Sequence, residues 1–148
     1  MHVSEVMTHD VVTAQAEDSL RSVGELMRDR NVGSVVICEG GRPVGVLTDR
    51  DLALAVVADG INPAEQAGPH ASRPLVSGKI AMDLEEAVAL MVQHRIRRLP
   101  VMRDDYLAGI VTIDDLAVRA GDLHLAQEIT AEVARAAIPE FYFHRRGG

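Results

Sequence analysis

Apolar residues recur at helical spacing in two stretches of the chain, residues 18–31 and residues 83–95. The apolar positions are Leu20, Val23, Leu26 and Met27 in the first stretch and Leu84, Ala87, Val88, Leu90 and Met91 in the second. Spacings of three and four residues place such side chains on one face of a helix. An acidic residue stands at the start of each stretch, as is common at helix starts. We therefore predict one amphipathic helix in each stretch.

Each predicted helix is followed by two β-rich runs, at residues 32–38 and 44–48 in one half of the chain and at residues 96–102 and 108–112 in the other. Gly40-Gly41 and Asp104-Asp105 lie between the runs and are turn-forming pairs, so we expect a hairpin in each half. A short extended piece precedes each helix, and helical spacing returns after each hairpin. The predicted order in both halves is βαββα.

The two halves are copies of one repeat. Residues 25–54 align with residues 89–118 without a gap, at a constant offset of 90 − 26 = 64 positions. Identical pairs include Leu26/Leu90, Met27/Met91, Gly45/Gly109, Thr48/Thr112, Asp51/Asp115, Leu52/Leu116 and Ala53/Ala117. A repeat of this size buries too little surface to be stable alone. We expect an α+β fold in which two tandem βαββα repeats pack through their sheets with pseudo-twofold symmetry.

The domain boundaries follow from this alignment. The repeats are expected at residues 5–62 and 74–121, and residues 63–73, rich in Ala, Pro and Gly, are predicted to form a linker with one helical turn. Residues 122–148 should add a C-terminal helix and tail. Pro139 is expected to stop this helix after residue 137, and the tail EFYFHRRGG either packs on the repeats or docks on a partner.

Composition narrows the function. Of the 148 residues 47% are hydrophobic and 3% aromatic, so the core must be aliphatic. The net charge of −7 argues against a nucleic-acid binder, which needs a basic face. The longest wholly apolar stretch, residues 52–58, is far shorter than the roughly 20 residues of a membrane span. A lone cysteine, Cys38, and the absence of a signal-like N-terminus fit a cytoplasmic protein.

The same short motif ends each hairpin, GVLTDRD at residues 45–51 and GIVTIDD at residues 109–115. A Thr at the end of a strand can offer its hydroxyl and backbone N–H to a phosphate beside a helix N-terminus. An Asp three residues later lies in the first helical turn, where its two oxygens can accept both hydroxyls of a ribose. The same two residues can instead form a capping box, which needs no ligand. The residues alone leave both roles open.

This pattern, G-h-h-[ST]-x-x-D with h an apolar residue, resembles the signature of the cystathionine β-synthase (CBS) domain family. VMTHDVVT at residues 6–13 and RRLPV at residues 97–101 are similar to the family's opening and second strands, and the resemblance covers residues 5–120. Tandem CBS pairs, or Bateman modules, bind adenosine-containing ligands. The resemblance implies a regulatory sensor for AMP, ADP or ATP, with NAD and S-adenosylmethionine as less favoured ligands.

In this family each nucleotide cleft combines the Thr/Asp element of one repeat with strands of the other. Matched by position, the resemblance implies one cleft around Thr48 and Asp51, completed by Ser72, Val76, Ile96 and Arg97. It implies a second cleft around Thr112 and Asp115, completed by Thr8, Val12, Val32 and Gly33. Adenine would then lie between aliphatic side chains such as Val12, Val32, Val46, Ile96 and Ile110.

The two implied clefts differ in charge. Arg97 and Arg98 stand where family members that bind phosphorylated nucleotides often carry His or Arg, whereas the first repeat has the uncharged Gly33 and Ser34 there. An Arg pair can hold phosphate through several charge-assisted hydrogen bonds. The resemblance therefore favours the Thr48/Asp51 cleft for a phosphorylated ligand. The alternative is that the two arginines are a solvated pair at a strand edge.

Catalysis is not expected. The six histidines are scattered without a metal-ligand spacing, Cys38 has no obvious His partner, and no P-loop or dinucleotide-binding fingerprint is present. We therefore predict no catalytic residue, no metal and no catalytic cofactor.

The competing function is a ligand-free dimeric protein-interaction module. The family's pairs usually dimerise through the helix after each motif, and the apolar runs at residues 52–58 and 116–120 favour a homodimer here. No catalytic or transport domain is attached within these residues. Any regulation is therefore expected to act in trans, on an unidentified protein partner.

Overall fold

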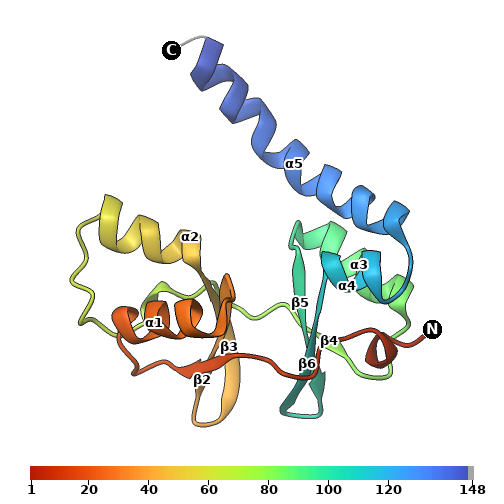
Figure 1. The fold of residues 1–148 in the computed structure, drawn as a ribbon, viewed down its shortest axis with the longest axis horizontal. Coiled ribbons are helices and arrows are strands. Elements are labelled where there is room, and N and C mark those ends of the chain that lie inside the picture. The colour runs from red at the N-terminus through yellow and green to blue at the C-terminus, as the bar shows by residue number, and fades with distance from the viewer. Residues whose placement is uncertain (147–148) are drawn as a thin grey trace. The chain divides into compact units, whose positions relative to one another are not determined.

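The computed structural model describes the backbone of residues 1–146 and the side chains of residues 1–134. Figure 1 shows the elements of the two repeats. The first repeat comprises β1 (Thr13–Gln15), α1 (Leu20–Arg30), β2 (Ser34–Glu39), β3 (Arg42–Thr48) and α2 (Asp49–Leu52), which a π-helix at Ala53–Ala58 extends. The second comprises β4 (Gly78–Lys79), α3 (Leu84–His94), β5 (Arg98–Arg103), β6 (Tyr106–Thr112) and α4 (Ile113–Val118). The C-terminal helix is α5 (Leu123–Arg146), and 3₁₀ turns lie at Val3–Glu5 and Gly68–His70. The predicted α+β fold of two βαββα repeats with a C-terminal helix is confirmed.

The offset of 64 holds for the structure as well as for the sequence. From α1 to β3, each helix and strand of the first repeat begins and ends 64 positions before its equivalent. Each repeat forms a three-stranded sheet, in the order β1-β2-β3 or β4-β5-β6. In each sheet the first strand runs parallel to the second, with Ala14 opposite Ile37 and Gly78 opposite Val101. The hairpin turns lie where the sequence places them, and Gly40 and Gly41 both adopt the positive φ that a tight hairpin turn requires.

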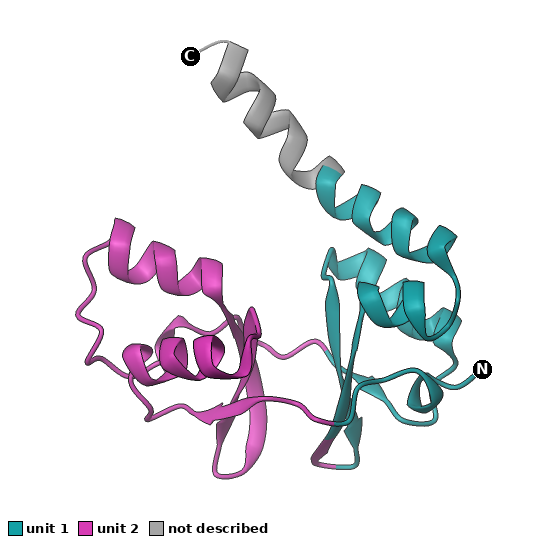
Figure 2. Cartoon of the chain, in the orientation of Figure 1, with its two compact units in different colours: residues 1–9, 77–104, 108–148 teal, residues 10–76, 105–107 magenta. Residues whose placement is uncertain are grey.

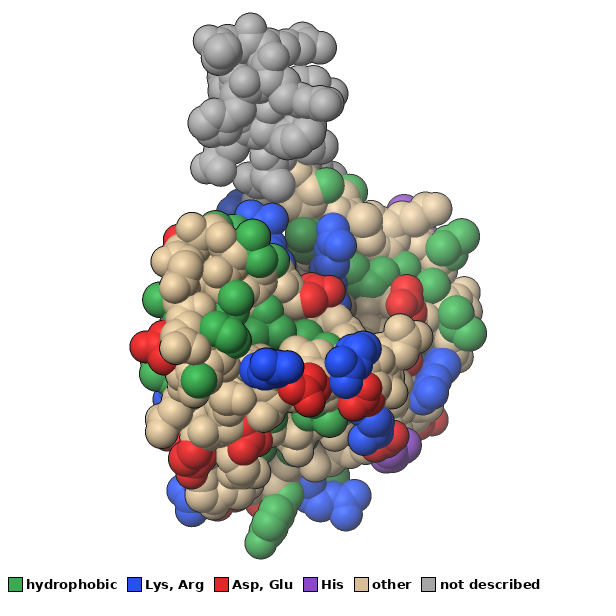
Figure 3. Space-filling view, turned by 60° about the vertical axis from the view of Figure 1, so that its left-hand side comes forward, with side chains coloured by type: hydrophobic (Ala, Val, Ile, Leu, Met, Phe, Trp, Pro, Cys, Tyr) green, Lys and Arg blue, Asp and Glu red, His purple; other side chains and the backbone are tan. Residues whose placement is uncertain are grey.

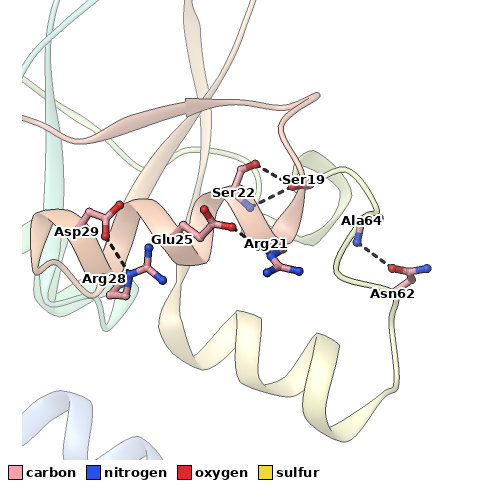
Figure 4. Close-up of polar contacts among 8 residues, drawn as sticks. All are labelled: Ser19, Arg21, Ser22, Glu25, Arg28, Asp29, Asn62 and Ala64. Atoms are coloured by element: carbon pink, nitrogen blue, oxygen red, sulfur yellow. Dashed lines mark hydrogen bonds and ion pairs between the residues drawn. The ribbon is translucent and has the colours of Figure 1, made fainter.

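Local signals explain where α1 begins and ends. The Ser19 hydroxyl accepts a hydrogen bond from the Ser22 backbone N–H at 3.0 Å, and Asn31 ends the helix in the left-handed conformation. Figure 4 shows this cap together with two ion pairs on the helix surface, Arg21–Glu25 and Arg28–Asp29. Such exposed pairs contribute little to stability. Most of the helix stability therefore comes from the buried face.

The chain divides into two compact units that do not coincide with the repeats (Figure 2). Unit 2 contains residues 10–76 and 105–107, so the predicted linker at residues 63–73 lies within it. Unit 1 contains residues 1–9, 77–104 and 108–148. The first nine residues thus precede strand β1 of the first repeat in sequence but belong to the unit built on the second.

Backbone hydrogen bonds account for this division. In unit 1, Thr8 and Ile110 each donate a backbone N–H to the other's carbonyl, at 2.8 and 2.9 Å. In unit 2, Ser72 donates to the Val46 carbonyl at 2.9 Å, and Val46 donates back at 3.4 Å. Thr8 and Ser72 lie 72 − 8 = 64 positions apart, and so do Val46 and Ile110. The last strand of each repeat is therefore paired with the segment that precedes the other repeat. We call this reciprocal pairing the strand exchange.

Aliphatic side chains fill both cores, as the composition requires. The buried side chains of unit 2 include Val12, Leu20, Val23, Met27, Val35, Ile37 and Leu47, and Cys38 is buried beside them. Burial raises the pKa of the Cys38 thiol, as expected for a thiol in apolar surroundings. The buried side chains of unit 1 include Val3, Val6, Met7, Leu84, Met91, Leu99, Val101, Val111 and Leu116. Helix α5 contacts α3 and α4, and its Ala126 and Ile129 are buried.

The predicted end of the C-terminal helix is wrong. Helix α5 continues past Pro139 to Arg146. Proline removes one backbone hydrogen bond and bends a helix, but it does not end a helix whose neighbouring residues keep helical dihedrals. The predicted packing or docking of the tail EFYFHRRGG concerns side chains that lie outside the described residues. Among the described residues, no helix is long and apolar enough to cross a membrane.

Candidate functional site

The candidate site is the Thr/Asp element at the junction between the last strand and the following helix of each repeat. Thr48 donates its backbone N–H to Asp51 Oδ2 at 2.8 Å, and Asp51 donates its N–H to Thr48 Oγ1 at 3.2 Å. Thr112 and Asp115 repeat this arrangement at 2.9 and 3.2 Å. Both elements are therefore capping boxes, as the spacing allowed. A capping box fixes the position of the carboxylate, whatever else that carboxylate binds.

Asp115 makes further contacts within unit 1. The Thr8 hydroxyl donates to its two oxygens, at 3.1 Å to Oδ1 and 3.4 Å to Oδ2. Arg119 Nε lies 3.6 Å from Oδ1, and the Arg119 guanidinium also donates to the Met7 carbonyl at 2.9 Å. Asp115 is buried, with 7% of its surface exposed. Both oxygens of this carboxylate therefore have partners inside the protein.

Asp51 is more open than Asp115. It is partly exposed, and its side-chain hydrogen bond within the described residues is the one from the Thr48 N–H to Oδ2. Oδ1 is left without a partner among those residues. A ribose hydroxyl needs such an acceptor. Of the two elements, the one in the first repeat therefore has the carboxylate that can accept a ligand hydroxyl without losing an internal bond.

The motif glycines serve the strand exchange. A Cβ atom added to Gly45 would lie 2.5 Å from the Ser72 carbonyl oxygen, and one added to Gly109 would lie 2.7 Å from the Thr8 carbonyl oxygen. The sequence allowed either a ligand or another backbone to approach these glycines closely. The structure shows another backbone at both positions.

The other predicted site residues fall into two groups by unit. Unit 2 holds Val12, Val32, Gly33, Val46, Ser72 and Val76, together with Thr48 and Asp51. Unit 1 holds Thr8, Ile96, Arg97, Arg98 and Ile110, together with Thr112 and Asp115. The structure thus brings Ser72 to the strand that leads to Thr48, and Thr8 to Asp115. The parts of each predicted cleft that come from the other unit stay a prediction.

Arg97 and Arg98 line an open cavity of about 290 Å³ within unit 1, together with Thr112, Ile113, Asp114 and Thr130. The Ile113 N–H donates to the Arg97 carbonyl at 3.1 Å, which ties the start of β5 to the start of α4. Neither guanidinium has an ion-pair partner among the described side chains. Both are available to an anion in this cavity, and their predicted role in the Thr48/Asp51 cleft stays a prediction.

Sequence analysis did not identify Arg119 as a site residue. It lies outside the motif, four residues after Asp115, at a spacing that lets two side chains meet on one helix face. The equivalent position of the first repeat, 119 − 64 = 55, is a buried alanine. This difference between the repeats is the signal that could have identified it.

Comparison with known proteins places the chain in a family. The model of the CBS domain family matches residues 3–58 and residues 70–121, which together cover both Thr/Asp elements. The chain belongs to the CBS domain family. As a tandem CBS pair it is 41% identical over 116 residues to the CBS domain-containing protein YhcV of Bacillus subtilis, covering 78% of this chain and 83% of that protein. The resemblance inferred from the motif is therefore confirmed.

Solved structures agree with this assignment. A CBS domain protein from Pyrobaculum aerophilum, complexed with AMP, superposes on this CBS pair with a TM-score of 0.75 at 27% sequence identity, covering 86% of this chain and 99% of that one. Hypoxic Response Protein I, solved with two coordinated zinc ions, superposes with a TM-score of 0.72 at 29% identity, covering 79% and 97%. In the described part of the present CBS pair, His, Cys, Asp and Glu side chains form no group of three or more that could hold a metal ion.

Proposed function

We propose that this CBS pair is a regulatory sensor that binds an adenosine-containing nucleotide, AMP, ADP or ATP before NAD or S-adenosylmethionine, and that it is not an enzyme. The observation that carries the proposal is the Thr48/Asp51 element, in which a fixed carboxylate keeps one oxygen without a partner among the described residues. The AMP complex of the relative from Pyrobaculum aerophilum supports an adenosine ligand. The sensor acts in trans on a protein partner and works in the cytoplasm.

Charge supports an anionic small molecule over nucleic acid. The chain carries a net charge of −7, and on the face shown in Figure 3 basic and acidic side chains are interspersed. Nucleic-acid binding needs a continuous basic surface to neutralise many phosphates. A single nucleotide needs only a few donors. Arg97 and Arg98 can supply them, since neither has an ion-pair partner among the described side chains. The role of the two arginines in holding the ligand's phosphate stays a prediction from the family resemblance.

Nucleotide binding should raise thermal stability. We expect saturable stabilisation by AMP, ADP or ATP, because a ligand that binds only the folded state stabilises it by RT ln(1 + [L]/Kd), about 2.7 kcal/mol at 100 times Kd. The measurement is a thermal-shift titration, repeated with NAD and S-adenosylmethionine and checked by calorimetry. Adenine-free phosphate compounds such as ribose 5-phosphate serve as the matched control. Absence of a shift with all five ligands would favour a ligand-free protein-interaction module.

The second candidate function is that interaction module, and the exposed apolar residues after each motif favour it. Leu54 and Val57 in the first repeat are 45% and 84% exposed, and Val118 in the second is 80% exposed. Leu54 and Val118 occupy equivalent positions, 118 − 54 = 64 residues apart. Leu54 and Val57 are three residues apart, which places them side by side on a helix, and neighbouring exposed apolar side chains can mark an interface. We propose that these residues form a homodimer interface, whether or not a nucleotide binds.

Dimerisation should depend on these side chains. The double variant Leu54→Asp/Val118→Asp is expected to be monomeric at concentrations where the unchanged protein is dimeric, because the interface would have to bury two carboxylates. Light scattering after size exclusion gives the mass. Tyr106→Asp, which charges another exposed apolar residue outside these helices, is the control and should leave the mass unchanged. A dimer that persists in the double variant would rule out this interface.

A further inference from the structure

The two Thr/Asp elements have the same backbone geometry but different surroundings. Each Asp accepts its capping bond from the preceding Thr N–H, at 2.8 Å for Asp51 and 2.9 Å for Asp115. Beyond this bond, Asp115 contacts Thr8 and Arg119, whereas Asp51 has no further side-chain partner among the described residues. The repeats therefore differ in how much acceptor capacity each carboxylate has left.

Thr8 supplies the first part of the difference. The backbone pairing with Ile110 fixes Thr8 on both sides, with bonds of 2.8 and 2.9 Å, and its hydroxyl then reaches both oxygens of Asp115. The equivalent residue of unit 2 is Ser72, which pairs with Val46 in the same way. Among the described residues, the Ser72 hydroxyl makes no hydrogen bond to Asp51. The strand exchange thus places a hydroxyl on one carboxylate only.

Arg119 supplies the second part. Its guanidinium donates to the Met7 carbonyl at 2.9 Å and lies 3.6 Å from Asp115 Oδ1, so it joins helix α4 to the segment that carries Thr8. Position 55, its equivalent, is alanine and can form neither contact. A carboxylate has about four lone-pair sites. On Asp115 the Thr112 N–H, the Thr8 hydroxyl and Arg119 use most of these sites, and only 8% of the side chain is exposed.

We infer that Thr8 and Arg119 close the Thr112/Asp115 element to ribose, so that each chain has one open ribose acceptor, Asp51. A ribose at Asp115 would have to displace the Thr8 hydroxyl and enter a buried site, whereas at Asp51 it meets an oxygen that has no partner in the part of the chain whose side chains are described. Arg119 and Thr8 are in this sense specificity-determining residues, because they decide which repeat binds the nucleoside. The inference rests on the proposed function and assigns its ligand to one of two otherwise equivalent elements.

Calorimetric titration of the full chain with AMP, and separately with ATP, tests this assignment. We expect about one bound nucleotide per chain. Asp51→Asn should weaken binding at least about tenfold, because a hydrogen bond to a charged acceptor is lost. Asp115→Asn should change the affinity less than about twofold. Asn keeps the acceptor oxygen of the capping box, so both variants should fold. Two equal sites in the unchanged protein, or tenfold weakening by Asp115→Asn alone, would overturn the inference.

The complementary test removes the two side chains that contact Asp115, and the resulting protein is called the opened variant. In Thr8→Ala/Arg119→Ala, the Asp115 oxygens lose both partners, and we expect about two nucleotides per chain. Adding Asp51→Asn should bring this number back to about one. The matched control, Thr13→Ala/Arg28→Ala, removes the same side chains from exposed positions of unit 2 and should keep one site. A folded opened variant that still binds one nucleotide would overturn the inference. If that variant does not fold, the titrations of the unchanged protein and the two Asn variants decide.

Failure of the proposed function and failure of this inference give different binding results. Absence of AMP and ATP binding in the unchanged protein and in the opened variant would overturn the proposed function, and this inference with it. Binding of two nucleotides to the unchanged protein, or of one nucleotide that depends on Asp115, would overturn the inference alone.

Discussion

Val6→Asp is expected to unfold unit 1, although Val6 lies outside the predicted second repeat. Val6 is 1% exposed and belongs, with Val3 and Met7, to the aliphatic core of that unit. An unpaired carboxylate in such a core costs several kcal/mol, which is comparable with the whole stability of a small domain. We expect a loss of at least about 4 kcal/mol. The N-terminal segment is thus a structural part of the unit that holds Asp115.

Amide hydrogen exchange, followed by mass spectrometry, localises this effect. In Val6→Asp the peptides of β5 and β6 should lose most of their protection. His9→Asp, in the same segment, is the matched control because His9 is exposed and the added carboxylate stays in water. It should exchange like the unchanged protein. Equal protection of β5 and β6 in the two variants would show that the N-terminal segment does not contribute to this core.

The parts of the fold that sequence reasoning predicted are those with local causes. Apolar spacing gave the two helices, which the structure places at Leu20–Arg30 and Leu84–His94. Turn-forming pairs gave the two hairpins, and the Thr/Asp spacing gave the capping boxes. In each case the residues that decide the structure lie within a few positions of one another. A pattern of such residues can be found in a single sequence.

The strand exchange has no such local cause: the family resemblance placed Thr8 at the Asp115 cleft and Ser72 at the Asp51 cleft, but the backbone pairing itself was not predicted. Residues 1–9 and 65–73 occupy equivalent positions in the two units, yet they share no identical residue at the offset of 64. Their pairing uses backbone groups, which every residue except proline offers, so side-chain identity is weakly constrained. The motif glycines were the available signal, because a glycine facing a strand often marks the close approach of another backbone.

For the candidate site too, sequence reasoning identified the residues of the local motif but not their contacts with distant segments. Thr48, Asp51, Thr112 and Asp115 were identified because a capping box is a local motif. The unequal surroundings of the two carboxylates were not identified, because they depend on Thr8, which is more than a hundred positions from Asp115. A repeat alignment emphasises what the copies share. In the proposed assignment, the repeat that binds the nucleoside is decided by positions where the copies differ, such as Arg119 and Ala55.

Gly45→Ala is expected to destabilise unit 2 by about 1–3 kcal/mol, the usual cost of forcing an extra methyl group into a packed site. The added Cβ would lie 2.5 Å from the Ser72 carbonyl oxygen, which belongs to a backbone and cannot rotate away. The strand must therefore move from Ser72, and the bonds between Val46 and Ser72 weaken. Urea unfolding, followed by circular dichroism, measures the change in the free energy of unfolding.

Gly24→Ala is the matched control, with the opposite expected sign. Its Cβ would lie 3.7 Å from Leu52 Cδ1, an ordinary contact, in the middle of α1. Alanine in a helix interior is more stable than glycine by about 1 kcal/mol. The same methyl group should thus stabilise unit 2 at position 24 and destabilise it at position 45. If both variants were stabilised, a side chain at position 45 would fit beside the Ser72 backbone. The distance of 2.5 Å would then not require glycine at this position.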